Sequence, residues 1–88
     1  MSGNEHEKLQ QDIVEVLSIL IGLDPGEIKV QDRLREDLGL DSLQSMELLS
    51  RICEKYDLDV EMEDVMEVET VGDVVARLGE IMQEQKGR

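Results

Sequence analysis

Apolar residues recur at intervals of three and four positions in three separate segments of this 88-residue chain. Such spacing places the apolar side chains on one face of an α-helix. We predict helices over about residues 5–21, from residue 41 or 42 to about 56, and from residue 70 to about 84, with frayed residues beyond. A short helical turn fits within residues 57–69. The predicted fold class is an all-α bundle of three long helices and one short one.

The core of this bundle must be aliphatic. Phe and Trp are absent and Tyr56 is the one aromatic residue, so Leu, Ile, Val and the methionines Met46, Met62, Met66 and Met82 fill it. A chain of this length has apolar residues for one core only, so we predict a single domain over residues 1–88 with a core over about 5–84. Residues 22–41 show no helical period and predict a long loop, of the kind that is often functional. Its apolar side chains are expected to pin it to the core: Leu23, Ile28, Val30, Leu34, Leu38 and Leu40.

The charge balance excludes several functions. Lys and Arg number 9 against 22 Asp and Glu, a net charge of -13, which repels nucleic acids and anionic membranes and favours basic partner surfaces. No apolar run approaches the length of a membrane span and no secretory leader is evident, so we expect a cytoplasmic monomer without membrane insertion. Cys53 alone forms no internal disulfide, and with His6 it cannot complete a zinc site. Met62 and Val68 stand where a calcium-binding loop needs Gly and Glu, so no metal site is expected.

The start of the second predicted helix has the most informative local pattern. Asp41 can cap the helix, with Gln44 reaching back in a capping box. A helical projection places Leu48, Leu49, Ile52 and Tyr56 toward the core, with Ser45 among them as a buried hydroxyl bonded to a backbone carbonyl. A second apolar margin, which suits a partner surface, holds Leu43, Met46, Ser50 and Cys53. By position alone, Ser42 either caps the helix or carries an anionic group at its N-terminus.

The run Gly39-Leu40-Asp41-Ser42-Leu43 resembles the attachment motif of acyl carrier proteins. The similarity extends over about residues 7–82, including Glu36-Asp37-Leu38-Gly39, Lys55-Tyr56-Asp57 and Thr70-Val71. This resemblance implies a carrier with no catalytic residue. A phosphopantetheinyl transferase would move 4'-phosphopantetheine from coenzyme A onto Ser42, and the arm would hold acyl groups as thioesters for fatty-acid-like, lipid or polyketide biosynthesis.

The resemblance also implies a recognition surface for acyl-transferring and synthase enzymes with basic docking patches. Asp41, Leu43, Met46 and Glu47 resemble that surface, and Ser50 and Glu54 extend it. Three departures hint at a specialised carrier. Residues 41–56 carry three acidic and two basic side chains, a net of -1, whereas residues 57–73 carry eight acidic and no basic ones. Glu61 replaces a frequent proline, and Leu40 a frequent alanine. Two alternatives stay open: a peptidyl or aminoacyl carrier, and an unmodified helical interaction subunit.

Overall fold

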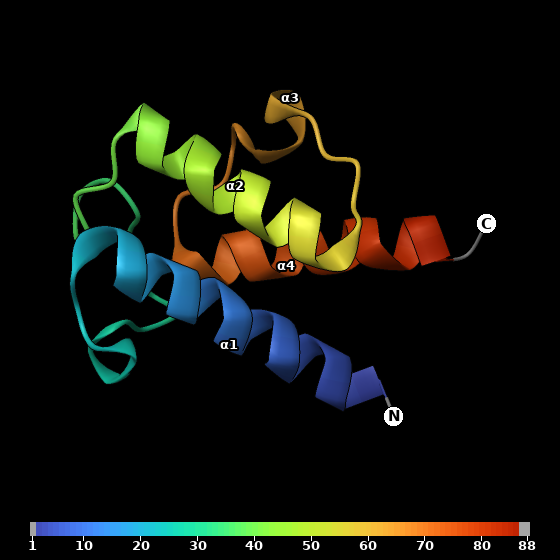
Figure 1. The fold of residues 1–88 in the computed structure, drawn as a ribbon, viewed down its shortest axis with the longest axis horizontal. Helices are drawn as coiled ribbons and strands as arrows, with labels where there is room; N and C mark the ends of the chain where they lie inside the picture. Colours follow the sequence, from blue (N-terminus) through green and yellow to red (C-terminus); the bar gives the residue numbers. More distant parts are fainter. Residues whose placement is uncertain (1, 87–88) are drawn as a thin grey trace.

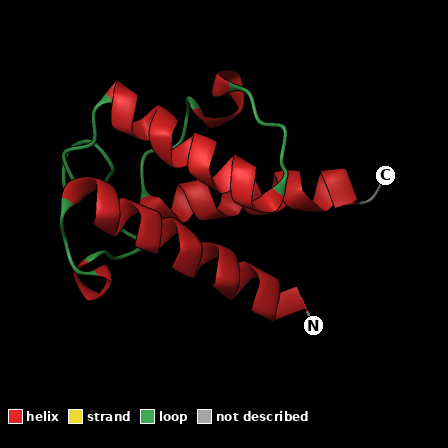
Figure 2. Cartoon of the chain, viewed as in Figure 1, coloured by secondary structure: helices red, strands yellow, loops and turns green. Residues whose placement is uncertain are grey.

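The computed structural model describes residues 2–86. Its α-helices are α1 (Ser2–Ile21), α2 (Ser42–Tyr56), α3 (Met62–Val65) and α4 (Val71–Lys86), with a 3-10 turn, η1 (Pro25–Glu27), in the first loop. Figure 1 shows the three long helices lying along one another with α3 at the rim, and Figure 2 shows the loops that join them. The described residues contain no strand, only an isolated bridge between Arg33 and Thr70. The predicted all-α bundle of three long helices and a short one is confirmed.

The outer ends of two helices differ from the prediction. Helix α1 begins at Ser2 rather than near residue 5, because apolar periodicity marks only the part of a helix that packs on a core. Helix α4 continues to Lys86 instead of fraying after residue 84. In its last turn, Gln85 donates to the Asp59 carbonyl over 2.9 Å and accepts from the Asp59 N–H over 3.2 Å. These two bonds fasten the last turn to the segment before α3.

The aliphatic core lies where α1 meets α2 and α4. Helix α1 packs against both of the other long helices. The buried side chains that form the core come from α1, the long loop, α2 and α4: Leu9, Ile13, Leu17, Ile28, Leu34, Leu40, Leu48, Ile52, Val71, Val74, Val75, Leu78 and Ile81. Tyr56, Leu38, Leu49 and Met82 are half-buried against this cluster. The predicted aliphatic core is therefore present.

Four residues predicted to be buried are exposed instead. Leu23 is 36% and Val30 41% exposed, so these two side chains do not pin the loop to the core. Met46 and Met66 also face solvent and do not belong to the core. The side chain of Met62 lies outside the described residues.

The loop over residues 22–41 is held to the start of α4 mainly through the backbone. The Leu34 N–H donates to the Glu69 carbonyl over 2.8 Å, and Gly72 donates to the Val30 carbonyl over 2.8 Å. Gly72 permits this approach, since a Cβ there would lie 3.3 Å from the Val30 oxygen. At the end of the loop, Gly39 adopts a φ of +71°, a conformation that favours glycine. The loop therefore delivers the chain to the first turn of α2 along a fixed path.

A buried polar cluster joins α1 to the end of α2. Asp12 is only 8% exposed. Its carboxylate accepts hydrogen bonds from the Tyr56 hydroxyl and, over 3.1 Å, from Lys55 Nζ. Burial raises the pKa of Asp12, but the bonds from Tyr56 and Lys55 and the positive charge of Lys55 together lower it below its ordinary value. Burial, followed by the hydrogen bond to Asp12, raises the pKa of Tyr56. The charged carboxylate and the neutral phenol are thus the favoured forms.

Candidate functional site

Ser42 is the first residue of α2 and is exposed. The capping role belongs to its neighbour Asp41, whose Oδ1 accepts the Gln44 N–H over 2.8 Å, while the Asp41 N–H donates to Gln44 Oε1 over 3.4 Å. The predicted capping box is therefore confirmed, and Ser42 is not the cap. Within residues 2–86, no side-chain hydrogen bond involves the Ser42 hydroxyl. The hydroxyl is available for covalent chemistry without loss of the cap.

Gln44 also fixes the position of this helix start. Its Nε2 donates to the Leu20 carbonyl over 3.2 Å, which ties the first turn of α2 to the last turn of α1. The carbonyls at a helix C-terminus lack partners within the helix, so this bond satisfies one of them. The position of Ser42 is consequently set by α1, by the cap and by the loop that precedes it.

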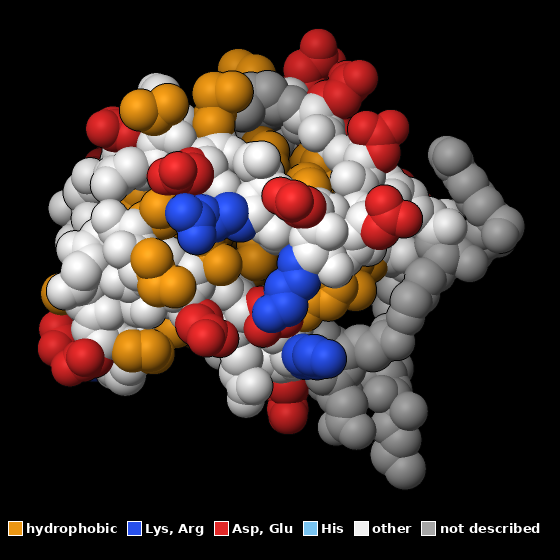
Figure 3. Space-filling model, viewed as in Figure 1, with side chains coloured by type: hydrophobic (Ala, Val, Ile, Leu, Met, Phe, Trp, Pro, Cys, Tyr) orange, Lys and Arg blue, Asp and Glu red, His pale blue; other side chains and the backbone are white. Residues whose placement is uncertain are grey.

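All six residues predicted to form the recognition surface are exposed along α2 or at its cap: Asp41, Leu43, Met46, Glu47, Ser50 and Glu54. Leu43 is 75% and Met46 52% exposed, unusual values for large apolar side chains. Figure 3 shows apolar side chains at the surface along the upper edge of the molecule, near the N-terminal half of α2, and acidic side chains toward α3. The apolar margin predicted from the helical projection therefore faces solvent, with Cys53 half-buried at its border.

The positive charges on α2 have acidic neighbours. Lys55 bonds to Asp12, and Arg51 Nη2 lies 4.0 Å from Glu47 Oε1. The Arg51 pair is well exposed on both sides and contributes little to stability. Glu54 and Asp41 form no ion pair in the described part of the chain. The surface around Ser42 thus presents acidic groups beside exposed apolar ones.

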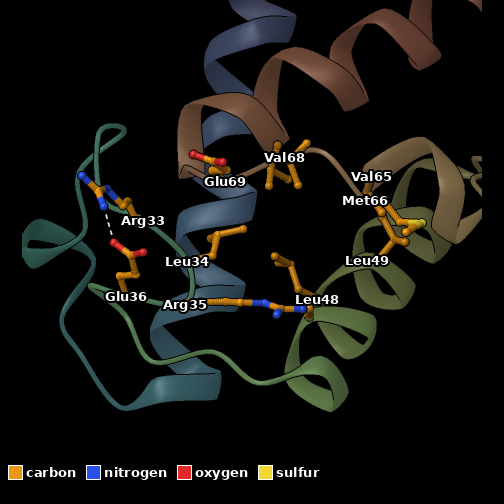
Figure 4. A pocket seen from close by; sticks show the side chains of 12 residues that line it. Arg33, Leu34, Arg35, Glu36, Leu48, Leu49, Val65, Met66, Val68 and Glu69 are labelled. Carbon is orange, nitrogen blue, oxygen red and sulfur yellow. Dashed lines mark hydrogen bonds and ion pairs between the residues drawn. The ribbon is translucent and has the colours of Figure 1, made fainter.

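A cavity of about 430 Å³ lies between α2, α3, the first loop and the start of α4. We name it the α2–α3 cavity. Most of its lining is apolar: Leu34, Leu48, Leu49, Val65, Met66, Val68 and Val74. Its polar lining residues are Arg33, Arg35, Glu36, Ser45 and Glu69. Figure 4 shows Leu34, Leu48 and Val68 pointing into it.

Ser45 corrects one prediction from the helical projection. It is half-buried and lines the α2–α3 cavity rather than being enclosed in the core. The projection assigned it to the core because it lies between Leu48 and Leu49 on the helix face. That face is only partly covered, since α3 stands apart from α2 and leaves the cavity between them. Ser45 follows Ser42 by three residues, so the two serines are neighbours on the helix surface.

The far wall of the cavity is fastened to α4. Arg77 Nε donates to the Asp64 carbonyl over 2.9 Å, and Arg77 Nη2 lies 3.4 Å from Asp64 Oδ1. Arg77 also pairs with Glu80 at 3.3 Å. Helix α3 is therefore anchored through its backbone to α4, while the cavity separates it from α2.

Sequence comparison identifies the family. The family model described as "Phosphopantetheine attachment site" matches residues 9–78. The chain belongs to the acyl carrier protein family. An acyl carrier protein of Exiguobacterium sp. is 39% identical over 70 residues, which cover 80% of this chain and 89% of that protein. The non-reducing polyketide synthase tazA of Aspergillus terreus is 38% identical over 73 residues, covering 83% of this chain and 3% of the synthase.

The fold is likewise shared with a solved structure, the acyl carrier protein from Enterococcus faecalis. That structure has a TM-score of 0.73 and 22% sequence identity, and the match covers 86% of this chain and 96% of that one. Membership of the family makes this protein a carrier with covalently attached 4'-phosphopantetheine, and not an enzyme. The predicted carrier function and cofactor are thus confirmed, and the alternative of an unmodified interaction subunit is set aside. Acyl carrier proteins interact with synthases and transferases. Within residues 2–86, each helix is too short or too polar to cross a lipid bilayer.

The residues at the start of α2 fit the cofactor. An exposed hydroxyl at the first position of a 15-residue helix lies beside backbone N–H groups whose dipoles favour a phosphate. The side chains of Leu43 and Met46 next to it suit the apolar parts of a tethered arm.

Proposed function

We propose that Ser42 carries the 4'-phosphopantetheine arm. The observation that supports it most directly is the division of roles between two neighbours. Asp41 caps α2, and the exposed Ser42 hydroxyl takes part in no side-chain hydrogen bond within the described residues. Esterification of this oxygen leaves the cap, the Gln44 contact with α1 and the core unchanged. Ser45 and Ser50 on the same helix lack this place at the N-terminus.

When attached, the arm supplies a terminal thiol that holds acyl groups as thioesters. The residues of the chain then position and shield the cargo. Ser42 tethers the arm within reach of the α2–α3 cavity, whose lining begins with Ser45 one turn along the helix. Leu48, Leu49 and Val68 provide the apolar wall against which an acyl chain lies. Tethering raises the effective concentration of the cargo at each partner's active site.

We also propose that the recognition surface named above docks a phosphopantetheinyl transferase and acyl-transferring or synthase enzymes. Its acidic members, Asp41, Glu47 and Glu54, steer basic patches toward Ser42, because charge complementarity speeds encounter more than it tightens binding. Leu43 and Met46 add apolar contact at the centre. Docking of this kind is fast and reversible, as a carrier that visits several enzymes requires.

The proposed setting is a monomeric domain over residues 1–88, working in the cytoplasm on fatty-acid-like, lipid or polyketide biosynthesis. A net charge of -13 opposes self-association, and the free, half-buried Cys53 suits a reducing compartment. The similarity to part of a polyketide synthase and the concentration of acidic residues over 57–73 favour a specialised carrier.

Intact-mass measurement tests the attachment site. The wild type is incubated with coenzyme A, Mg²⁺ and a broad-specificity phosphopantetheinyl transferase, and we expect one phosphopantetheine to be added. Ser42→Ala should gain none, while Ser45→Ala, a matched serine change on the same helix outside the recognition surface, should gain one. A modified Ser42→Ala protein, or a wild type left unmodified by several such transferases, would contradict the proposal.

A further inference from the structure

Arg35 differs from the other arginines of the described residues. Arg33 pairs with Glu36, Arg51 with Glu47, and Arg77 with Asp64 and Glu80. For Arg35, residues 2–86 provide neither an ion pair nor a side-chain hydrogen bond. Its side chain is exposed, so water is its partner in the absence of cargo. It lines the α2–α3 cavity.

Figure 4 shows how Arg35 lies at this cavity. Its side chain extends from the first loop across to Leu48 of α2, whereas Arg33 and Glu36 are bonded to each other on the side away from α2. The Glu36 carboxylate is therefore engaged with Arg33 rather than with Arg35. The guanidinium therefore lies between the first loop and α2, and the described residues supply no acceptor for its donors.

A second donor lies on the same wall. Ser45 is half-buried, lines the cavity and follows the proposed attachment residue Ser42 by one helical turn. The cavity combines an apolar interior with hydrogen-bond donors that come from two different elements.

This combination discriminates between kinds of acyl group. Beside an unsubstituted alkyl chain the exposed Arg35 guanidinium keeps its hydration water and gains no acceptor from the cargo. A ketone or carboxylate oxygen on the chain would replace that water with a charge-assisted hydrogen bond, and the planar guanidinium can give two such bonds to one group.

We infer that the α2–α3 cavity takes acyl groups that carry oxygen acceptors along the chain, and that Arg35 is the residue that selects them over plain alkyl groups. This inference rests on the proposed attachment of the arm at Ser42. Either a ketone or a carboxylate on the acyl group can supply the oxygen that accepts a hydrogen bond from Arg35.

Three eight-carbon cargoes separate these outcomes: octanoyl, 5-oxooctanoyl and octanedioyl groups, each loaded from its coenzyme A thioester by the transferase and verified by intact mass. We expect the oxygen-bearing forms to melt about 4–8 °C above the octanoyl form, about half the shift of a buried charge-assisted hydrogen bond, because Arg35 is exposed and water competes for its donors. The Arg35 Nε–Hε resonance should move in the same forms. The cargo that shifts this resonance shows whether Arg35 binds the ketone or the carboxylate.

Variants assign the effect to Arg35. Arg35→Met should abolish the difference in melting temperature between cargoes, and Arg35→Lys should retain part of it for octanedioyl. Arg51→Met removes the same charge from the exposed surface of α2, outside the cavity, and should retain the full difference. Equal melting temperatures for all three loaded wild-type forms, or an unchanged difference in Arg35→Met and Arg35→Lys, would overturn the inference while leaving the carrier function intact. Absence of a mass gain would overturn both.

Discussion

Removal of one hydroxyl, in Tyr56→Phe, should destabilise the fold more than removal of the neighbouring charge in Lys55→Met. Both side chains donate to the Asp12 carboxylate, which is 8% exposed. The Lys55 side chain is 53% exposed, so water takes over its role when the pair is broken. The phenol is half-buried, and water cannot replace it at the carboxylate without opening the contact between α1 and α2.

The expected magnitudes follow from these exposures. A hydrogen bond to a buried charged group contributes about 2 kcal/mol, the loss expected for Tyr56→Phe. A half-exposed ion pair contributes about 0–1 kcal/mol, the loss expected for Lys55→Met. In a domain of this size a 2 kcal/mol loss lowers Tm by about 8–16 °C.

The difference between wild type and Tyr56→Phe should also depend on pH. The pKa of Asp12 is lowered in the fold, so its stabilising contribution is complete above the unfolded value of about 4 and is lost as pH falls through the folded pKa. The pKa of Tyr56 is raised, so its contribution is complete below about pH 10 and is lost as pH rises further. The difference should therefore be constant between these limits and shrink outside them.

Urea unfolding followed by far-UV circular dichroism measures both effects at fixed ionic strength. Asp12→Ala and the double variant Asp12→Ala/Tyr56→Phe complete a mutant cycle that isolates the pairwise contribution. A Lys55→Met loss equal to or larger than the Tyr56→Phe loss would refute the assignment of the stabilisation to the phenol. A Tyr56→Phe difference that persists unchanged at pH 11 would refute its linkage to ionisation.

Three further predictions concern the ends of α2, α3 and the loop. Arg77→Met should speed amide exchange within residues 62–69, measured by mass spectrometry, while global stability falls by about 1 kcal/mol or less, because Arg77 is partly exposed and fastens only α3. Gly39→Ala should cost about 1 kcal/mol in urea unfolding from its φ of +71° alone, since nothing lies within 4 Å of an added Cβ; a neutral result would refute the left-handed turn. Asp41→Ala should cost about 1 kcal/mol through loss of the cap, whereas Ser42→Ala should leave the urea midpoint unchanged; equal losses would assign the cap to Ser42.

The local features of this protein were predictable from its sequence because their causes are local. The three- and four-residue spacing of Leu, Ile and Val predicts the long helices, and the Asp41–Gln44 pair predicts the start of α2, which the structure confirms with hydrogen bonds between residues three apart. The Thr70–Asp73 pair caps α4 in the same way, at 3.1 and 3.2 Å. The exposure of Ser42 and Leu43 also follows from helix geometry.

The polar cluster and the cavity were decided by tertiary structure. Asp12 meets Lys55 and Tyr56 across 43 and 44 residues of sequence, and nothing in the polar face of α1 distinguishes this carboxylate from its exposed neighbours. The α2–α3 cavity lies between α2 and an α3 that Arg77 fastens to α4, so Ser45, assigned to the core by periodicity, lines the cavity instead. Periodicity specifies which face of a helix is apolar. What covers that face, and where a guanidinium such as Arg35 is left without a partner among the described residues, depends on contacts between distant segments that only the folded chain brings together.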